Sequence, residues 1–177
     1  MTQEKFLEIK EGYIKNIKRF ISETGDIFPH ITVFALSKKN ESENAIIHIP
    51  IDEHFLSSEE AKDKFIDDVV PEVAKELKKE FIPEGIAWTS EAWIRVFDKS
   101  EGIPDDWKSK TPKKEVVMIN LQFPKWKEFI VYEIKRLGKQ VNEDGDLVDY
   151  VELIEEDFSG GEESGGRLSN LLEKFID

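Results

Sequence analysis

The chain has 177 residues, of which 38 are acidic and 25 basic, so its formal net charge is −13. This length fits one ordinary domain, and a hydrophobic content of 39% is enough for a core. The negative charge disfavours nucleic acids and anionic membranes as partners, and the absence of cysteine excludes disulfides, thiolate nucleophiles and cysteine-bound metal centres.

The first part of the chain predicts one helix and one hairpin. Apolar residues recur every three or four positions over 3–22, the pattern of an amphipathic helix. Two β-branched runs follow at 30–36 and 45–51, and the polar residues between them favour a hairpin with an eight-residue connection. Because Pro50 cannot donate a ladder hydrogen bond, we expect the second strand to lie at an edge or to end there.

A second helix is predicted over 58–81. Ser57 and Glu60 have the spacing of a capping box at its start. Pro71 lies inside this helix and removes one backbone donor. We therefore expect a kink near Val69 or two abutting helices.

From Gly85 onward, apolar residues recur at every second position, which predicts a strand-rich second half. Asp144-Gly145 favours a tight turn and hence antiparallel pairing of the last two strands. The order α-β-β-α-β-β-β-β predicts an α+β fold, an antiparallel sheet with helices packed on it and a short C-terminal helix. The four later strands are expected at 85–97, 115–123, 127–137 and 147–155.

One sheet face is predicted to form the core. In strand geometry Ile86, Trp88, Ile94 and Val96 share a face. The apolar stripes of both long helices need such a surface, so we expect both helices to pack on this one face.

The C-terminal region is predicted to be separate from a single domain over 1–157. Residues 158–166 are rich in Gly, Glu and Ser, as in a flexible linker, and 167–177 predict an amphipathic helix. Residues 141–177 contain twelve acidic and two basic residues. A helix this short is marginal without packing, so we expect it to dock on its own sheet or on another molecule.

The three histidines are candidates for a metal site or a general base. The predicted hairpin sets His48 opposite Phe34, which puts it about 13 Å from His30 at the usual strand rise. His54 follows in a loop. We therefore expect no metal site and no cofactor.

The spacing of Asn142, Asp144 and Asp146 resembles a calcium-binding loop. Such a loop also needs Gly at its sixth position and Glu at its twelfth, where this chain has Leu147 and Leu153. A hairpin turn accounts better for these residues.

The most distinctive run is Trp88–Arg95. Glu91, Trp93 and Arg95 share the face opposite to the predicted core, where Trp93 could anchor a partner and Arg95 could contact a carboxylate or another anion. The alternative is that a helix covers this face too, with Glu91 and Arg95 paired across Trp93.

A further segment carries a resemblance. Ser90-Glu-Ala-Trp93, then Pro112-Lys-Lys-Glu-Val-Val-Met-Ile119 and Ile130-Val-Tyr-Glu-Ile-Lys135, are similar to small uncharacterised proteins of bacteria and phages. The resemblance covers 85–137 and implies a bacterial or phage origin. It carries no known activity and therefore implies no catalytic residue.

No motif identifies a reaction, so our first hypothesis is a non-enzymatic cytoplasmic protein that binds another protein or a second copy of itself. We expect no membrane contact, because no apolar run has the length of a spanning helix and the N-terminus does not resemble a signal peptide. The acidic C-terminal region and tethered helix suit docking in a partner's groove. The predicted binding residues are Glu91, Trp93, Arg95, Leu168, Leu171 and Phe175.

Two other hypotheses remain open. The first is a small enzyme that uses carboxylates, such as Glu91 with Asp149 or Glu152, because two carboxylates held close together raise one pKa. A concave pocket containing two of these groups would favour it. The other is an acidic protein that mimics the charge of DNA, for which the carboxylates must be spaced like phosphates on a rigid surface.

Overall fold

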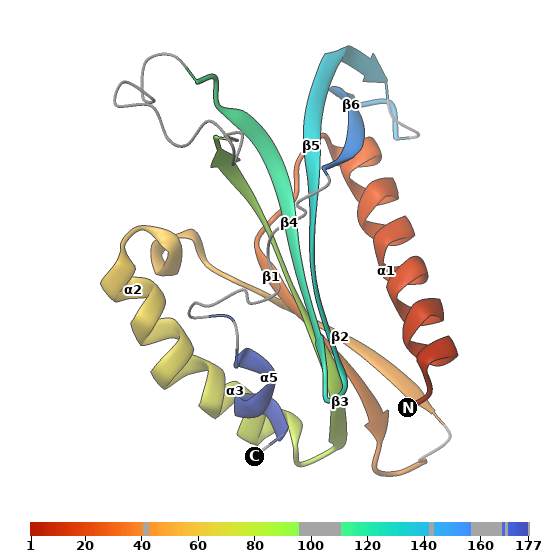
Figure 1. Ribbon diagram of the computed structural model, residues 1–177, viewed down its shortest axis with the longest axis vertical. Helices are drawn as coiled ribbons and strands as arrows, with labels where there is room; N and C mark the ends of the chain where they lie inside the picture. The colour runs from red at the N-terminus through yellow and green to blue at the C-terminus, as the bar shows by residue number, and fades with distance from the viewer. Residues whose placement is uncertain (41–42, 96–110, 142–143, 157–167, 169, 177) are drawn as a thin grey trace, which may run out of the picture.

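The computed structural model describes residues 1–40, 43–95, 111–141, 144–156, 168 and 170–176. Within them, six strands form an antiparallel sheet in the order β2-β1-β3-β4-β5-β6 (Figure 1). The predicted α+β fold with an antiparallel sheet is therefore confirmed. The strands are β1 (His30–Ser37), β2 (Asn44–Pro50), β3 (Phe81–Ile94), β4 (Lys114–Phe123), β5 (Trp126–Val141) and β6 (Leu147–Glu156).

β1 and β2 form the predicted hairpin, and β2 is an edge strand that ends at Pro50. The pairing register differs from the expected one. Thr32, and not Phe34, lies opposite His48. The turn shifts the pairing by two residues, which keeps each side chain on its predicted face but changes its neighbours.

Helix α1 (Gln3–Thr24) covers one face of the sheet. The Thr2 hydroxyl accepts a hydrogen bond from the Lys5 N–H at its start, and Gly25 ends it in the left-handed conformation at φ +83°. The buried stripe of α1 packs on side chains from β1, β3, β4, β5 and β6. It consists of Phe6, Tyr13, Ile17 and Ile21.

A second helical layer covers the other face. Its N-cap is Ser58, whose hydroxyl accepts from the Ala61 N–H at 3.1 Å, one residue later than the predicted capping box. The interruption predicted near Val69 is confirmed as a wide π-helical turn just before Pro71. The elements are η1 (Glu53–Leu56), α2 (Glu59–Lys64), η2 (Phe65–Val69) and α3 (Val70–Leu77).

The expectation that both long helices share one face is wrong (Figure 1). Trp88 is 7% exposed and lies with Ile86 in the core beneath α3, as predicted. Ala87 points the opposite way into the core beneath α1. Because consecutive residues of β3 are apolar, both faces of the sheet need a helical cover.

The C-terminal helix α5 (Leu171–Ile176) packs on the sheet of its own chain, next to α3 (Figure 1). Leu171, Leu172 and Phe175 are at most 3% exposed. Gln122 on β4 holds this segment, because its amide oxygen accepts the Leu172 N–H at 3.0 Å and its amide nitrogen donates to the Leu168 carbonyl. Of the two docking sites that the sequence left open, α5 occupies the one on its own sheet.

The predicted turn between β5 and β6 is confirmed, with Gly145 at φ +89°. The predicted linker, 158–166, lies outside the described residues. In the part of the chain that the structure describes, no helix is long and apolar enough to cross a membrane.

Candidate functional site

The predicted binding surface lies on β3. Trp93 is 64% exposed, as an anchor for a partner requires. Its two neighbours on that face make separate contacts. The Glu91 carboxylate accepts the Ile27 N–H at 2.7 Å, whereas Arg95 Nε donates to the Thr111 carbonyl at 2.9 Å. Glu91 and Arg95 thus hydrogen-bond to other residues rather than to each other.

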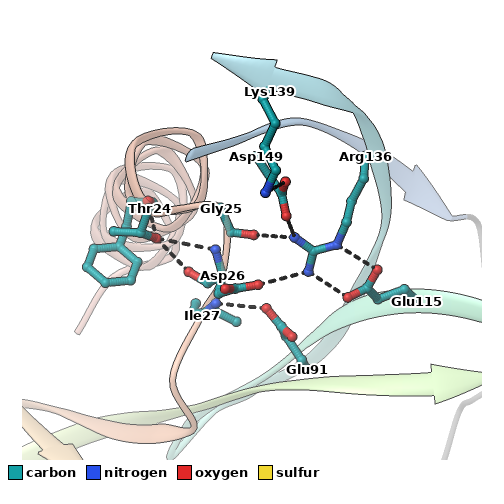
Figure 2. Close-up of polar contacts among 10 residues, drawn as sticks. Thr24, Gly25, Asp26, Ile27, Glu91, Glu115, Arg136, Lys139 and Asp149 are labelled. Atoms are coloured by element: carbon teal, nitrogen blue, oxygen red, sulfur yellow. Dashed lines mark hydrogen bonds and ion pairs between the residues drawn. The ribbon is translucent and has the colours of Figure 1, made fainter. Parts of the chain in front are cut away.

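A polar cluster surrounds Arg136 on β5 (Figure 2). Arg136 Nη1 donates to the Gly25 carbonyl at 2.8 Å and to Asp149 at 2.9 Å. Nη2 donates to Asp26 at 2.9 Å. Glu115 accepts two bonds from the same guanidinium, at 2.7 and 3.0 Å. One cation thus joins three carboxylates and ties the end of α1 to β4, β5 and β6.

Glu91 lies at the margin of this cluster (Figure 2). Burial raises the pKa of Glu91, and the nearby charges of Asp26 and Glu115 raise it further. The pKa of Asp149 is lowered instead, mainly by Lys139. Two of the carboxylates predicted from the sequence, Glu91 and Asp149, therefore lie around the same arginine and have opposite pKa shifts (Figure 2).

The contacts of this cluster are those of an ion-pair network and not those of two carboxylates that share a pocket. The Arg136 guanidinium lies between Glu91 and Asp149 (Figure 2). The third predicted carboxylate, Glu152, is next to the buried Val151 on β6 and faces the other side of the sheet. None of these carboxylates lines the cavity described below.

We expect Arg136→Met to lower the free energy of unfolding at neutral pH by about 2–3 kcal/mol, between the effects of exposed and buried ion pairs. The lowered pKa of Asp149 means that its ion pairs stabilise the fold above about pH 4 and are lost as the pH falls through that lowered pKa. Urea unfolding at a series of pH values should therefore show the variant approaching wild type on acidification.

Lys139→Met is the matched control for this measurement. Lys139 pairs with Asp149 alone among the carboxylates of the cluster, and its side chain is 58% exposed. Its loss should cost less than about 1 kcal/mol. Equal losses in the two variants would contradict a central role for Arg136.

A second polar cluster lies beneath α1, around the Tyr13 hydroxyl. This oxygen is 3.1 Å from His30 Nε2, 3.2 Å from Thr32 Oγ1 and 2.7 Å from Thr89 Oγ1. Thr32 Oγ1 is also 2.9 Å from His48 Nδ1. The network thus connects α1, β1, β2 and β3. Tyr13 and both threonines are buried, whereas His48 is exposed.

The predicted separation of the histidines is wrong. The rings of His30 and His48 have centroids 5.7 Å apart, because the hairpin register is shifted. His54 lies apart from them and bonds to Asp52 at 2.7 Å. The described residues contain no group of three or more His, Asp or Glu side chains that could hold a metal ion.

Burial sets the protonation of this network. It raises the pKa of Tyr13 and lowers the pKa of His30, and the adjacent His48 lowers the latter further. The phenol and the His30 imidazole are therefore both neutral near pH 7.

Tyr13, Thr32 and Thr89 were not predicted from the sequence as functional residues. One signal was available for Tyr13, which falls within the apolar stripe of α1, where a buried hydroxyl needs hydrogen-bond partners. Those partners come from strands 17 to 76 residues away, so their identity follows only from the register.

A cavity of about 640 Å³ lies between α1 and the β1–β2 hairpin. It exists because α1 packs most closely against β6, toward the opposite edge of the sheet. Tyr13, His30 and His48 contribute polar groups to its lining. The large apolar side chains that line it are Ile9, Ile17, Phe20, Phe28, Phe34 and Ile46.

No family model matches the chain, and neither the curated proteins nor the solved structures compared with it include a match. The resemblance of 85–137 to bacterial and phage proteins therefore stays a prediction. The function has to be inferred from the geometry of the cavity and the surface alone.

Proposed function

We propose that the protein binds a small, largely apolar molecule in the cavity between α1 and the β1–β2 hairpin. Phe20, Phe28 and Ile46 line this cavity while remaining 40%, 67% and 58% exposed. Large apolar side chains gathered around a concave surface are typical of a binding site. This gathering is the observation that carries the proposal.

The size and polarity of the cavity support the same function. Its volume of about 640 Å³ lies within the range of about 300–1,000 Å³ that is typical of small-molecule sites. Its exposed lining is mostly apolar surface, and Tyr13, His30 and His48 are among the polar residues that line it. Charged residues line it too, and its two cations, Lys5 and Arg19, pair with lining carboxylates, Glu8 and Glu23. Such groups orient a ligand whose remaining surface is held by apolar contact.

Gly12 adds a second line of support. It lies in the interior of α1, where glycine destabilises a helix by roughly 0.5–1 kcal/mol relative to alanine. A Cβ atom built at Gly12 would meet no atom within 4 Å, so no close packing requires the glycine. Gly12 does line the cavity, where its missing side chain leaves room for a ligand.

We expect Gly12→Leu to weaken binding while it strengthens the fold. The leucine side chain would enter the cavity and should lower the affinity for an uncharged fluorescent dye, Nile red, by about tenfold or more, because it displaces apolar contacts. The free energy of unfolding should rise by about 0.5–1 kcal/mol, since leucine favours the helix. Dye titration and urea unfolding measure the two effects.

Gly12→Ala is the matched control. It should give a similar gain in stability, with a much smaller loss of dye affinity, because a methyl group fills little of the cavity. Because binding and stability are expected to change in opposite directions, unfolding cannot account for the result. Unchanged dye binding by Gly12→Leu would overturn the proposed function.

A contact with a protein partner is a second candidate function. It is favoured by Trp93, which is 64% exposed and matches the aromatic anchors enriched in interfaces. The C-terminal helix lends no support, because its apolar residues Leu171 and Phe175 are buried against their own sheet. The proposed partner contact therefore rests on Trp93.

This second function is tested by sedimentation of the full chain and by pull-down from a host extract, each with wild type and Trp93→Ala. Loss of self-association, or of one retained protein, in the variant alone would support a contact at Trp93. The same sedimentation profile and the same retained proteins for both chains would contradict it.

A further inference from the structure

The five polar contacts around Tyr13 constrain where each proton lies. They are the contacts of its hydroxyl with His30, Thr32 and Thr89, the contact between Thr32 and His48, and the contact between His30 Nδ1 and the Phe28 carbonyl. When both imidazole rings are in their neutral form, three hydroxyls and two rings supply one proton each. The number of protons therefore equals the number of bonds.

The donor and acceptor of each hydrogen bond can be assigned in turn, starting from His30. Its Nδ1 is 2.8 Å from the Phe28 carbonyl oxygen, which can only accept, so Nδ1 carries the ring proton. Burial keeps the imidazole neutral by lowering its pKa, and Nε2 is then a lone pair. The Tyr13 hydroxyl must therefore donate to His30 Nε2 across the 3.1 Å contact.

The next two bonds follow from the single proton of Tyr13. Since that proton is used on His30, the phenol oxygen can only accept from its other neighbours. Thr89 therefore donates to it at 2.7 Å, and Thr32 donates to it at 3.2 Å. A phenol oxygen has the capacity to accept both bonds.

The last hydrogen bond of this series involves His48. The Thr32 proton is used on Tyr13, so the 2.9 Å contact between Thr32 Oγ1 and His48 Nδ1 requires a proton on Nδ1. In the neutral ring Nε2 is then a lone pair. Within the described residues no hydrogen bond involves Nε2, and His48 lines the cavity.

We propose that His48 presents a hydrogen-bond acceptor, Nε2, to the cavity, and that the ligand is an uncharged amphipathic molecule whose polar end donates a hydrogen bond, such as an alcohol or an amide N–H. This inference rests on the proposed function. It disfavours a carboxylate at Nε2 when the ring is neutral, because the two lone pairs would face each other. The two cations of the lining, Lys5 and Arg19, already pair with Glu8 and Glu23.

The proton order is tested first, without a ligand. Two-bond proton–nitrogen correlation spectra of the full chain at about pH 8, where neutral imidazoles predominate, show which ring nitrogen is protonated. We expect the proton on Nδ1 in both His30 and His48. A proton on Nε2 of His48 would overturn the inference, whatever the cavity binds.

Two matched variants test whether Thr32 fixes the position of the His48 proton. Thr32→Val removes the acceptor of His48 and should move its proton to Nε2. Thr89→Val deletes an equally buried hydroxyl that also bonds to Tyr13, and it should leave His48 unchanged. A Thr32→Val spectrum with the His48 proton still on Nδ1 would contradict the proposed series of hydrogen bonds.

The ligand class is tested with phenylbutanol and phenylbutyrate, which share an apolar body and differ in the polar end. At about pH 8 we expect phenylbutanol to bind at least about tenfold more tightly, because the carboxylate leaves Nε2 without a donor. Equal or tighter binding of phenylbutyrate would overturn this inference and support the proposed function. If neither probe bound, the proposed function itself would fail, even with the proton order confirmed.

Discussion

Ending the chain at Asp157 is expected to lower the free energy of unfolding by several kcal/mol. The truncation removes Leu171, Leu172 and Phe175, which are at most 3% exposed in the core beneath α5. It also removes the two hydrogen bonds of the Gln122 amide to that segment, each worth about 0.5–1.5 kcal/mol. Urea unfolding of the two chains measures the difference.

Two point variants test whether the loss of stability comes from the buried side chains of α5. Phe175→Ala should cost about 3–5 kcal/mol, as for other large side chains lost from a core. Ile176→Ala changes the next residue, which is 41% exposed, and should cost less than about 1 kcal/mol. If truncation lowered association but not stability, the helix would act as a docking element for another molecule, which would contradict its place in the core of its own chain.

Trp88→Ala is expected to cost about 3–5 kcal/mol of unfolding free energy. Trp88 is 7% exposed, and its ring lies 6.1 Å from that of Phe65 in an edge-on arrangement. Its indole N–H donates to Ser90 at 3.3 Å. The substitution would leave a cavity between β3 and the π-helical turn. Urea unfolding at neutral pH provides the measurement.

Trp93→Ala is the natural comparison, because it removes the same side chain five residues along the same strand. Trp93 is 64% exposed, so its loss should cost less than about 1 kcal/mol. A loss below that value for Trp88→Ala, or equal losses for both variants, would contradict the assignment of faces on β3.

Local patterns predicted most of the elements, because strand alternation and helix periodicity are encoded by near neighbours. Pro50 marked the end of β2, and Gly145 marked the turn between β5 and β6. The side of the sheet that each helix covers was not predictable in this way. Ile86 and Ala87 are both buried although they face opposite layers, so the apolar pattern of β3 is compatible with either arrangement.

The candidate site depended on contacts that are remote in sequence. The predicted separation of His30 and His48 was wrong because the predicted hairpin register was off by two residues. That register is set by the turn. Arg136 lies 110 residues from Asp26, and their contact requires α1 to end beside β6. Tyr13 was visible only as a member of an apolar stripe. Sequence reasoning could therefore find candidate side chains but not the cavity that groups them.

The placement of α1 has a consequence for synthesis of the protein. This helix is synthesised before every strand of the sheet, yet the rings that Phe6 contacts are those of Phe123 and Trp126. A nascent chain that has reached Ile94 contains α1 and β1–β3 but none of β4, β5 or β6. The Phe6 end of α1 therefore stays without its aromatic partners until β4 and the start of β5 have been made, and chaperones can cover its apolar surface in the meantime.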